Sequence, residues 1–363
     1  MSGRVGFIHH EGYGEISFTP PPIQITERYK KTYDILKELG VFNDKARVYV
    51  PTHAREEDLL LVHTKEYIDF VRKMSKIGTG FLDYGDTPAY KGIFELSCLR
   101  TGASLLAIDL VMNEEVNHAF NPGGGFHHAD KDSAGGFCVF NDVVIGVKYI
   151  ERKYDVRKIA IVDIDGHHAD GTQKILYEEP VLKISLHKYE PFFYPGTGGI
   201  EEIGIGKGRG YSVNIPLPSN TYDEAYLYAF KEIVPPLIKA YDPEILIHQF
   251  GVDGHYLDPL VGLSLTTRAY QEVSEIVHKL AHETADGRYV ILGGGGYNPD
   301  NVARCWSIMF VRISEALPEE SIEKFELLHD KVELNKDKRL FDEVKERVKL
   351  IKEKVFPIHG LDY

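Results

Sequence analysis

Cysteines and long hydrophobic runs are both scarce in this chain of 363 residues. Its three cysteines, Cys98, Cys138 and Cys305, lie far apart, which argues against a disulfide framework and against a zinc finger. No apolar run approaches the roughly 20 residues of a membrane-spanning helix, and the first residues lack the apolar region of a signal peptide. We therefore expect a cytoplasmic protein that is not attached to a membrane.

Basic residues are also fewer than acidic ones. The formal net charge of −13 at pH 7 argues against general affinity for nucleic acid, whereas a cationic substrate would be tolerated or attracted. The hydrophobic content of 43% and charged content of 27% are typical of a soluble globular protein. No linker, repeat or change of composition divides the chain, so we expect one domain over residues 1–363. The oligomeric state stays open.

Apolar strands alternate with helical segments along most of the chain. This alternation predicts an α/β protein with an open, mostly parallel sheet that carries helices on both faces. Loops are expected at residues 12–22 and 190–211, a helix interrupted by its two prolines at 223–241, and a charged helical tail at 322–355. The expected strands are residues 5–8, 47–50, 116–120, 159–164, 181–186, 244–250 and 289–292.

The end of the predicted strand at residues 159–164 carries a dense group of ionisable side chains. They are Asp163, Asp165, His167, His168 and Asp170. Buried charges must be paired or must bind a metal. Asp165 and His167 are two positions apart, so on an extended segment they point to the same side and form a candidate metal-ligand pair. The alternative is a solvated loop that carries these charges by chance.

Four other predicted strands also end in polar or glycine-rich segments, which contain His127 and His128, His187, Asp253 and Tyr297. In open α/β sheets, ligands bind beyond the carboxyl ends of the strands, so we expect these segments to meet at one edge. Catalytic zinc usually has three protein ligands, and Asp253 is the best third candidate. The alternative for Asp253 is a turn residue. Two carboxylates and one imidazole suit Zn²⁺ but also Fe²⁺.

Two adjacent imidazoles, His127 and His128, follow three glycines, where the backbone can approach a ligand closely. Asp163 and Asp170 could each orient one imidazole and stabilise its charge. The two histidines would then form a general acid–base pair beside a metal-activated water.

A run of four glycines at residues 293–296 precedes Tyr297. The run lacks the spacing of a phosphate-binding loop, and we interpret it as a flexible turn that presents the Tyr297 hydroxyl to a developing oxyanion. Phe137, Phe193 and Tyr194 lie in glycine-flanked loops. They could wall a narrow apolar channel, or pack in the core.

Taken together, the motifs resemble the zinc-dependent histone deacetylase family, and within it the acetoin-utilisation-type deacetylases of bacteria and archaea. They follow the family's order and extend over roughly residues 5–310, which leaves a helical tail at 311–363. The matching segments are residues 124–129 (GGFHHA), 136–142 (GFCVFND), 163–171 (DIDGHHADG), 185–188 (SLHK), 195–198 (PGTG), 249–253 (QFGVD), 258–260 (DPL) and 293–297 (GGGGY).

The resemblance implies an arginase-deacetylase α/β fold and a catalytic centre. Zn²⁺ would bind Asp165, His167 and Asp253. His128, paired with Asp170, would be the general base and acid. His127, paired with Asp163, would add electrostatic stabilisation, and Tyr297 would polarise the amide carbonyl.

The resemblance also implies a substrate tunnel. Asp86 would hold the substrate backbone at the rim, and the carbonyl of Gly136 would accept the side-chain amide proton. Phe137 and Tyr194 would line the wall, and Arg28 would belong to an internal acetate-release region. A structural potassium ion would lie near Asp163 and Ser185 and the backbone oxygens of Asp165, His167 and Leu186.

Some positions depart from the family pattern and leave the substrate preference open. Phe126 stands where many relatives have Trp, Gly166 where Ala is common, and Tyr194 where Phe is usual. The leading hypothesis is a hydrolase that removes acetyl or other acyl groups from acyl-lysine in a protein. The alternatives are a deacetylase of small acetylated amines or polyamines, a two-metal ureohydrolase, and a non-catalytic acyl-lysine binding protein. Ala169 and His255 stand where a ureohydrolase would carry further aspartates.

Overall fold

The computed structural model describes residues 4–14 and 26–363, so the loop predicted at 12–22 lies mostly outside the described residues. Eight strands form one sheet in the order β2-β1-β3-β8-β7-β4-β5-β6, and every pair of neighbours among them is parallel. The predicted α/β class with a parallel sheet is confirmed. The strands are β1 Val5–Ile8, β2 Ala46–Tyr49, β3 His118–Asn121, β4 Ile159–Asp163, β5 Leu182–Lys188, β6 Ser212–Leu217, β7 Ile245–Gln249 and β8 Tyr289–Leu292.

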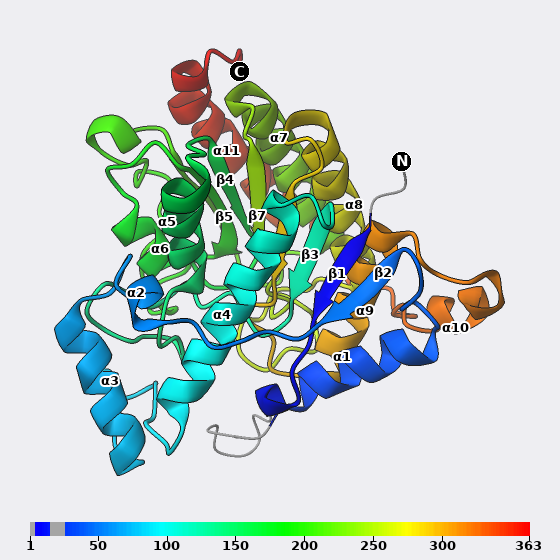
Figure 1. The fold of residues 1–363 in the computed structure, drawn as a ribbon. Helices are drawn as coiled ribbons and strands as arrows, with labels where there is room; N and C mark the ends of the chain where they lie inside the picture. The colour runs from blue at the N-terminus through cyan, green and yellow to red at the C-terminus, as the bar shows by residue number, and fades with distance from the viewer. Residues whose placement is uncertain (1–3, 15–25) are drawn as a thin grey trace.

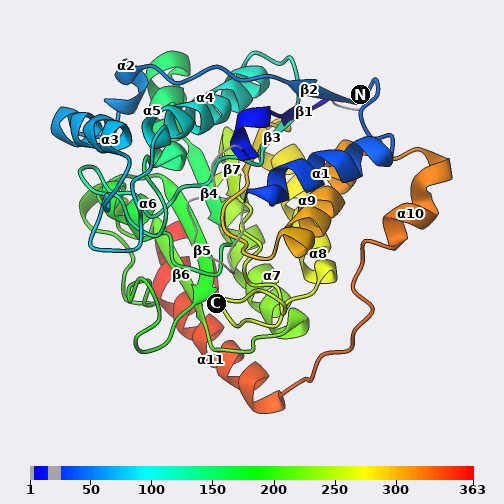
Figure 2. The same ribbon diagram turned by 90° about the horizontal axis from the view of Figure 1, so that it is seen from below.

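Helices cover both faces of the sheet (Figure 1, Figure 2). One face carries α2 Glu56–Leu59, α3 Lys65–Ile77, α4 Ile93–Met112, α5 Asp142–Tyr154 and α6 Asp170–Ile175. The other face carries α1 Glu27–Glu38, α7 Asp223–Tyr241, α8 Thr267–Thr284, α9 Pro299–Ser314 and α11 Lys338–Val355, while the short α10 Ile322–Glu326 lies to one side. No helix in these described parts of the chain is both long and apolar enough to cross a bilayer.

The sheet is apolar because it is covered on both faces. Every residue of β4, β7 and β8 is buried, as expected for parallel strands between two helix layers. Since all strands run in one direction, their carboxyl ends share one edge of the sheet. The segments that follow β3, β4, β7 and β8 therefore start side by side.

Two elements are absent from the sequence-based prediction, β6 and α9. β6 contains Pro216, which an edge strand tolerates because one side of its backbone needs no ladder hydrogen bonds. α9 begins after Asn298, whose side chain accepts hydrogen bonds from the backbone N–H groups of Asp300 and Asn301. Pro299 occupies the first turn of the helix, where its missing N–H costs nothing.

The predicted interruption of the helix at Pro235 and Pro236 is wrong, because α7 runs unbroken from Asp223 to Tyr241. Val234 and Leu237 on either side of the prolines are fully buried, and α7 packs against both α8 and α11. This tertiary packing outweighs the backbone hydrogen bonds that the two prolines remove.

The tail is likewise not the continuous helix that the sequence predicts. A non-helical segment between α10 and α11 holds Asp330, which accepts hydrogen bonds from the backbone N–H of Thr267 and from Arg304, both at 2.8 Å. Its carboxylate also lies 2.9 Å from Nε2 of His255. These contacts fix the segment to α8, α9 and the loop after β7, and they keep it out of a helix.

Candidate metal centre and active site

The three predicted metal ligands converge beyond the ends of β4 and β7. Asp165, His167 and Asp253 are all buried, and one ligand atom from each lies within 4.8 Å of the other two. Nδ1 of His167 is 2.9 Å from Oδ2 of Asp253 and 3.3 Å from Oδ1 of Asp165. Two carboxylate oxygens and one imidazole nitrogen at this spacing fit a single divalent cation.

This group carries surplus negative charge. Burial opposes a charge on His167, but the hydrogen bonds and charges of Asp165 and Asp253 outweigh it and raise the pKa of His167 to about 10. A proton therefore competes for the lone pair that a metal would use. The carboxylates are also held in place, because Gly295 N–H donates to Asp165 at 2.7 Å and Gly166 N–H donates to Asp253 at 2.6 Å.

The positions around the metal group are glycines because neighbouring atoms approach them too closely for a Cβ atom to fit. A Cβ atom at Gly295 would lie 2.6 Å from Oδ2 of Asp253 and 2.7 Å from Oδ2 of Asp165. A Cβ atom at Gly125 would lie 2.6 Å from the backbone nitrogen of Gly294, whose N–H donates to the loop of residues 123–125 at 2.8 Å. The two glycine-rich loops thus pack backbone against backbone, and the run before Tyr297 is anchored rather than merely flexible.

Both predicted carboxylate–imidazole pairs are present beside this group. Nδ1 of His127 lies 2.8 Å from Asp163, and Nδ1 of His128 lies 2.6 Å from Asp170. The Nε2 atoms of the two histidines face each other at 3.1 Å. Each carboxylate therefore orients one ring so that its Nε2 points to the same space.

The two imidazoles differ in charge. Burial disfavours a charged His127, but Asp163 and Asp165 outweigh it and raise the pKa of His127 to about 9. Burial and the neighbouring His127 lower the pKa of His128 to about 4, although Asp170 opposes them. At neutral pH, His127 is thus protonated while His128 is neutral and able to accept a proton.

Aromatic rings surround the metal group on its solvent side. The ring of Phe193 stacks on His167 at a centroid distance of 5.2 Å and an interplanar angle of 8°. The ring of Tyr194 meets His128 edge-on at 5.0 Å and 78°. The structure thus brings Phe193 and Tyr194, two of the three predicted wall residues, to the site, although they lie in the long loop after β5.

Tyr297 stands on the opposite side of the same space. Its ring lies 6.5 Å from that of His167 and 6.0 Å from that of Phe137. Its backbone N–H donates to Asp258 at 2.8 Å, which fixes the end of the glycine run. Burial, with the nearby carboxylates, raises the pKa of Tyr297 well above its usual value, so the hydroxyl remains a donor.

The rim is formed by a strained turn. Gly136 and Phe137 both have left-handed backbone angles, φ +53° and +66°, and such strain in a residue other than glycine is concentrated at functional sites. A Cβ atom at Gly136 would lie 2.3 Å from the ring of His128. The exposed Asp86 accepts the N–H of Gly136 at 3.1 Å, so the predicted rim residue also holds this turn.

The inner end of the site is lined by two arginines. A small cavity of about 40 Å³ extends from His128 and Tyr297 to Arg28 and Arg100. Arg28 donates to the backbone oxygen of Gly296 at 2.9 Å. Arg100 was not singled out from the sequence, and within residues 4–14 and 26–363 its buried Nε and Nη2 have no hydrogen-bond partner. The signal available for Arg100 was a lone cation within the otherwise apolar stretch of α4.

The residues predicted to hold potassium are neighbours in the sheet. Asp163 on β4 and Ser185 on β5 are register partners, and Leu186 follows directly. The Ser185 hydroxyl oxygen lies 2.9 Å from Nδ1 of His187, so His187 faces this side of β5. His255 pairs with Asp330 and does not join the metal group.

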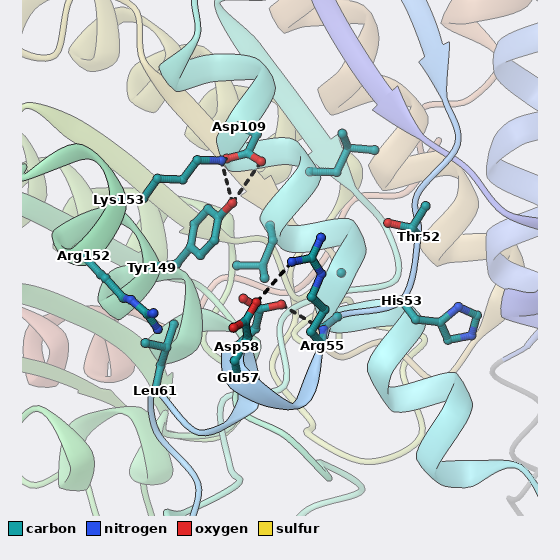
Figure 3. Close-up of a pocket in the computed structure, with 14 residues that line it drawn as sticks. Thr52, His53, Arg55, Glu57, Asp58, Leu61, Asp109, Tyr149, Arg152 and Lys153 are labelled. Carbon is teal, nitrogen blue, oxygen red and sulfur yellow. Dashed lines mark hydrogen bonds and ion pairs between the residues drawn. The ribbon is translucent and has the colours of Figure 1, made fainter.

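A separate hollow of about 540 Å³ lies between α2, α4 and α5, away from the metal group (Figure 3). Four of its charged side chains are paired with one another. Arg55 lies 3.2 Å from Glu57, and Lys153 lies 2.7 Å from Asp109. Because these charges are satisfied locally, we assign no chemistry to this hollow.

Comparisons with known proteins identify the family of this chain. The family model of the histone deacetylase domain matches residues 23–313. The chain is 39% identical over 316 residues to the acetoin utilization protein AcuC of Bacillus subtilis (strain 168), covering 83% of this chain and 80% of that protein. It is 40% identical over 298 residues to a probable deacetylase of Archaeoglobus fulgidus, covering 81% of each.

The fold is also that of a solved relative. A crystal structure of an HDAC homologue complexed with SAHA matches with a TM-score of 0.81 and 28% identity, covering 96% of this chain and 100% of that one. The resemblance predicted from the motifs is confirmed by all three comparisons. On this evidence the chain belongs to the histone deacetylase family.

Proposed function

We propose that this protein is a metal-dependent deacetylase that removes acetyl or other acyl groups from acyl-lysine side chains. The observation that carries the proposal is the meeting of a buried Asp-His-Asp group with two carboxylate-paired histidines at one narrow cavity. Asp165, His167 and Asp253 would hold Zn²⁺, or Fe²⁺ as the second candidate. Such an ion supplies Lewis-acid polarisation of the substrate carbonyl and lowers the pKa of water.

The protein's own side chains divide the proton transfers. The neutral His128 accepts a proton from the attacking water at Nε2 and later gives it to the leaving amine, while Asp170 keeps the ring oriented. The protonated His127, held by Asp163, places a positive charge beside the reacting carbonyl. The Tyr297 hydroxyl donates a hydrogen bond to the oxyanion as it forms.

The substrate's extended side chain would enter between the rings of Phe137, Phe193 and Tyr194. At the rim, Asp86 would accept hydrogen bonds from the substrate backbone, and the carbonyl of Gly136 would accept the amide N–H. The excess of acidic residues favours a lysine-rich segment around the acylated residue.

The proposal extends to the rest of the chain. A structural potassium ion near Asp163 and Ser185, with backbone oxygens of Asp165, His167 and Leu186, would stiffen the ends of β4 and β5. The residues after 310 would complete the same domain, a proposal supported by the packing of α11 on α7 and β6.

A small acetylated amine is the second candidate substrate. The cavity beyond the rim is narrow, and the carboxylates of Asp83 and Asp86 lie together at the entrance, where they would suit the free ammonium group of a polyamine. A protein substrate would instead use Asp86 through backbone hydrogen bonds.

One experiment separates these possibilities. Release of acetate from an acetyl-lysine peptide and from an acetylated polyamine is measured before chelation, after chelation, and after Zn²⁺ or Fe²⁺ is restored. We expect metal-dependent turnover of the peptide, with His128→Asn as an inactive control that still binds metal. Peptide binding without turnover by the metal-loaded protein would favour an acyl-lysine binding protein and would refute the deacetylase proposal.

A further inference from the structure

A second group of metal-binding side chains lies at the opposite edge of the sheet. His118 is the first residue of β3, and His278 and His282 lie one turn apart on α8. The catalytic histidines follow the other end of β3, so the length of this strand separates the two groups. Among the described residues, these are the two groups of three side chains that could share an ion.

The three rings converge through their Nε2 atoms. Nε2 of His278 lies 3.0 Å from Nε2 of His118 and 3.1 Å from Nε2 of His282. The ring centroids are 4.6 to 5.0 Å apart, and both rings on α8 stand nearly perpendicular to that of His118. A tetrahedral ion with Zn–N bonds of 2.0–2.1 Å separates its ligand nitrogens by about 3.4 Å, so shifts of a few tenths of an ångström would suffice.

Hydrogen bonding alone accounts poorly for this arrangement. A neutral imidazole has one N–H and one lone pair, so Nε2 of His278 cannot make two good bonds to its neighbours at once. No ion pair joins any of the three rings to a carboxylate within the chain that the structure describes. Glu315, at the end of α9, is the acidic group that acts on His278 from a neighbouring element.

The buried His118 and the half-buried His278 are shielded from solvent, which disfavours a positive charge on either ring. Burial, together with His278 and His282, lowers the pKa of His118 to about 3. Burial and His282 lower the pKa of His278 to about 4. Neither ring therefore carries the second proton that would block its lone pair, which lies on Nε2 when the ring proton is on Nδ1.

We propose that His118, His278 and His282 form a second metal site, for a late first-row divalent ion such as Zn²⁺, Ni²⁺ or Cu²⁺. These ions bind readily to imidazole nitrogens, whereas Mg²⁺ and Ca²⁺ prefer oxygen ligands, which this group of three imidazoles does not supply. His118 is buried, His278 is half-buried and His282 is exposed, so an ion reaches the site from solvent. Bound there, it would join the start of β3 to the second half of α8.

Metal content of the full-length protein tests this proposal. After chelation, wild type and variants are saturated with Zn²⁺ and dialysed, and the zinc per chain is measured. We expect two ions in wild type, one in His278→Ala and one in His282→Ala. The matched control is His53→Ala, which removes an exposed imidazole elsewhere and should keep two ions.

Two further measurements make the outcome decisive. Asp253→Asn removes a ligand of the catalytic metal group, so this variant should retain one ion, at the histidine cluster. The double variant Asp253→Asn/His278→Ala should bind none. Deacetylase turnover of His282→Ala should equal that of wild type, which separates this site from the catalytic one. Equal zinc content in wild type and His278→Ala would overturn the proposal and leave the three imidazoles as a hydrogen-bonded cluster.

Discussion

The substitution Gly295→Ala adds a methyl group beside the metal group. It tests whether the carboxylates of Asp165 and Asp253 have room to move. That Cβ would lie 2.6 Å from Asp253 and 2.7 Å from Asp165, whereas ordinary contacts begin at 3.4 Å. Each carboxylate oxygen would have to withdraw by about 0.7–0.8 Å, and metal sites tolerate deviations of only about 0.2 Å. Loss of an outer partner alone typically weakens metal binding about 10- to 100-fold, so we expect at least this loss.

The backbone at Gly295 makes this substitution a clean test. Its φ lies outside the left-handed region, so alanine adds a steric contact and no backbone strain. The matched control is Gly199→Ala, whose Cβ would lie 3.5 Å from the nearest atom, the Tyr189 hydroxyl oxygen, again without a left-handed φ.

Zinc affinity is measured by competition with a chelator, turnover at saturating zinc, and melting without added metal. We expect Gly295→Ala to lose zinc affinity and turnover while melting close to Gly199→Ala. Wild-type zinc affinity in Gly295→Ala would refute the reasoning, because the carboxylates would then have room that the structure denies them. A large drop in melting temperature would place the effect on the fold instead.

Three further predictions concern single side chains. Tyr297→Phe removes one hydrogen-bond donor to the oxyanion, so it should lower kcat about 10²- to 10³-fold while KM and metal content change little. Activity within a few-fold of wild type would refute that role for Tyr297. Tyr194→Phe should shift preference among acyl-lysine substrates at constant metal content, and identical profiles would show that the hydroxyl does not face the channel. Burial lowers the pKa of Lys183 to about 7 against about 10.4 in the unfolded chain, so the unfolded state binds more protons between these values. His127 and His167, whose pKa values are raised, oppose the resulting rise of stability with pH in wild type and Lys183→Met alike, so the prediction is a difference between the two. In urea unfolding, Lys183→Met should be more stable than wild type at pH 7, and this advantage should shrink as the pH rises to 10.

Much of the sheet was predictable because its strands are buried on both faces. A run such as residues 289–292 has only apolar side chains between turn signals, and the structure places β8 at those residues. β6 escaped prediction because Asn214 and Pro216 break the apolar pattern, and its burial depends on α11, which lies more than a hundred residues later. The continuity of α7 likewise depends on packing against α8 and α11, which local proline signals do not report.

The candidate site was predictable for a related reason. The carboxyl ends of parallel strands must share an edge, so His127, Asp165 and Asp253 could be grouped before any contact was known. The His118 cluster had a weaker signal. His278 and His282 are four apart on a helix, but their partner comes from the start of a strand 160 residues earlier than His278. That meeting depends on how α8 crosses the sheet, which spacing alone does not encode.

The contact between Asp330 and His255 bears on the order in which the protein is made. His255 lies two residues after the metal ligand Asp253, and its carboxylate partner follows 75 residues later in the chain. At about 5–20 residues per second, a ribosome needs about 4–15 s to reach that partner. During this interval the nascent chain contains Asp165, His167 and Asp253 but lacks the contact that holds the loop carrying Asp253 in place. The catalytic edge of the sheet is thus completed by a segment that is synthesised well after all three ligands.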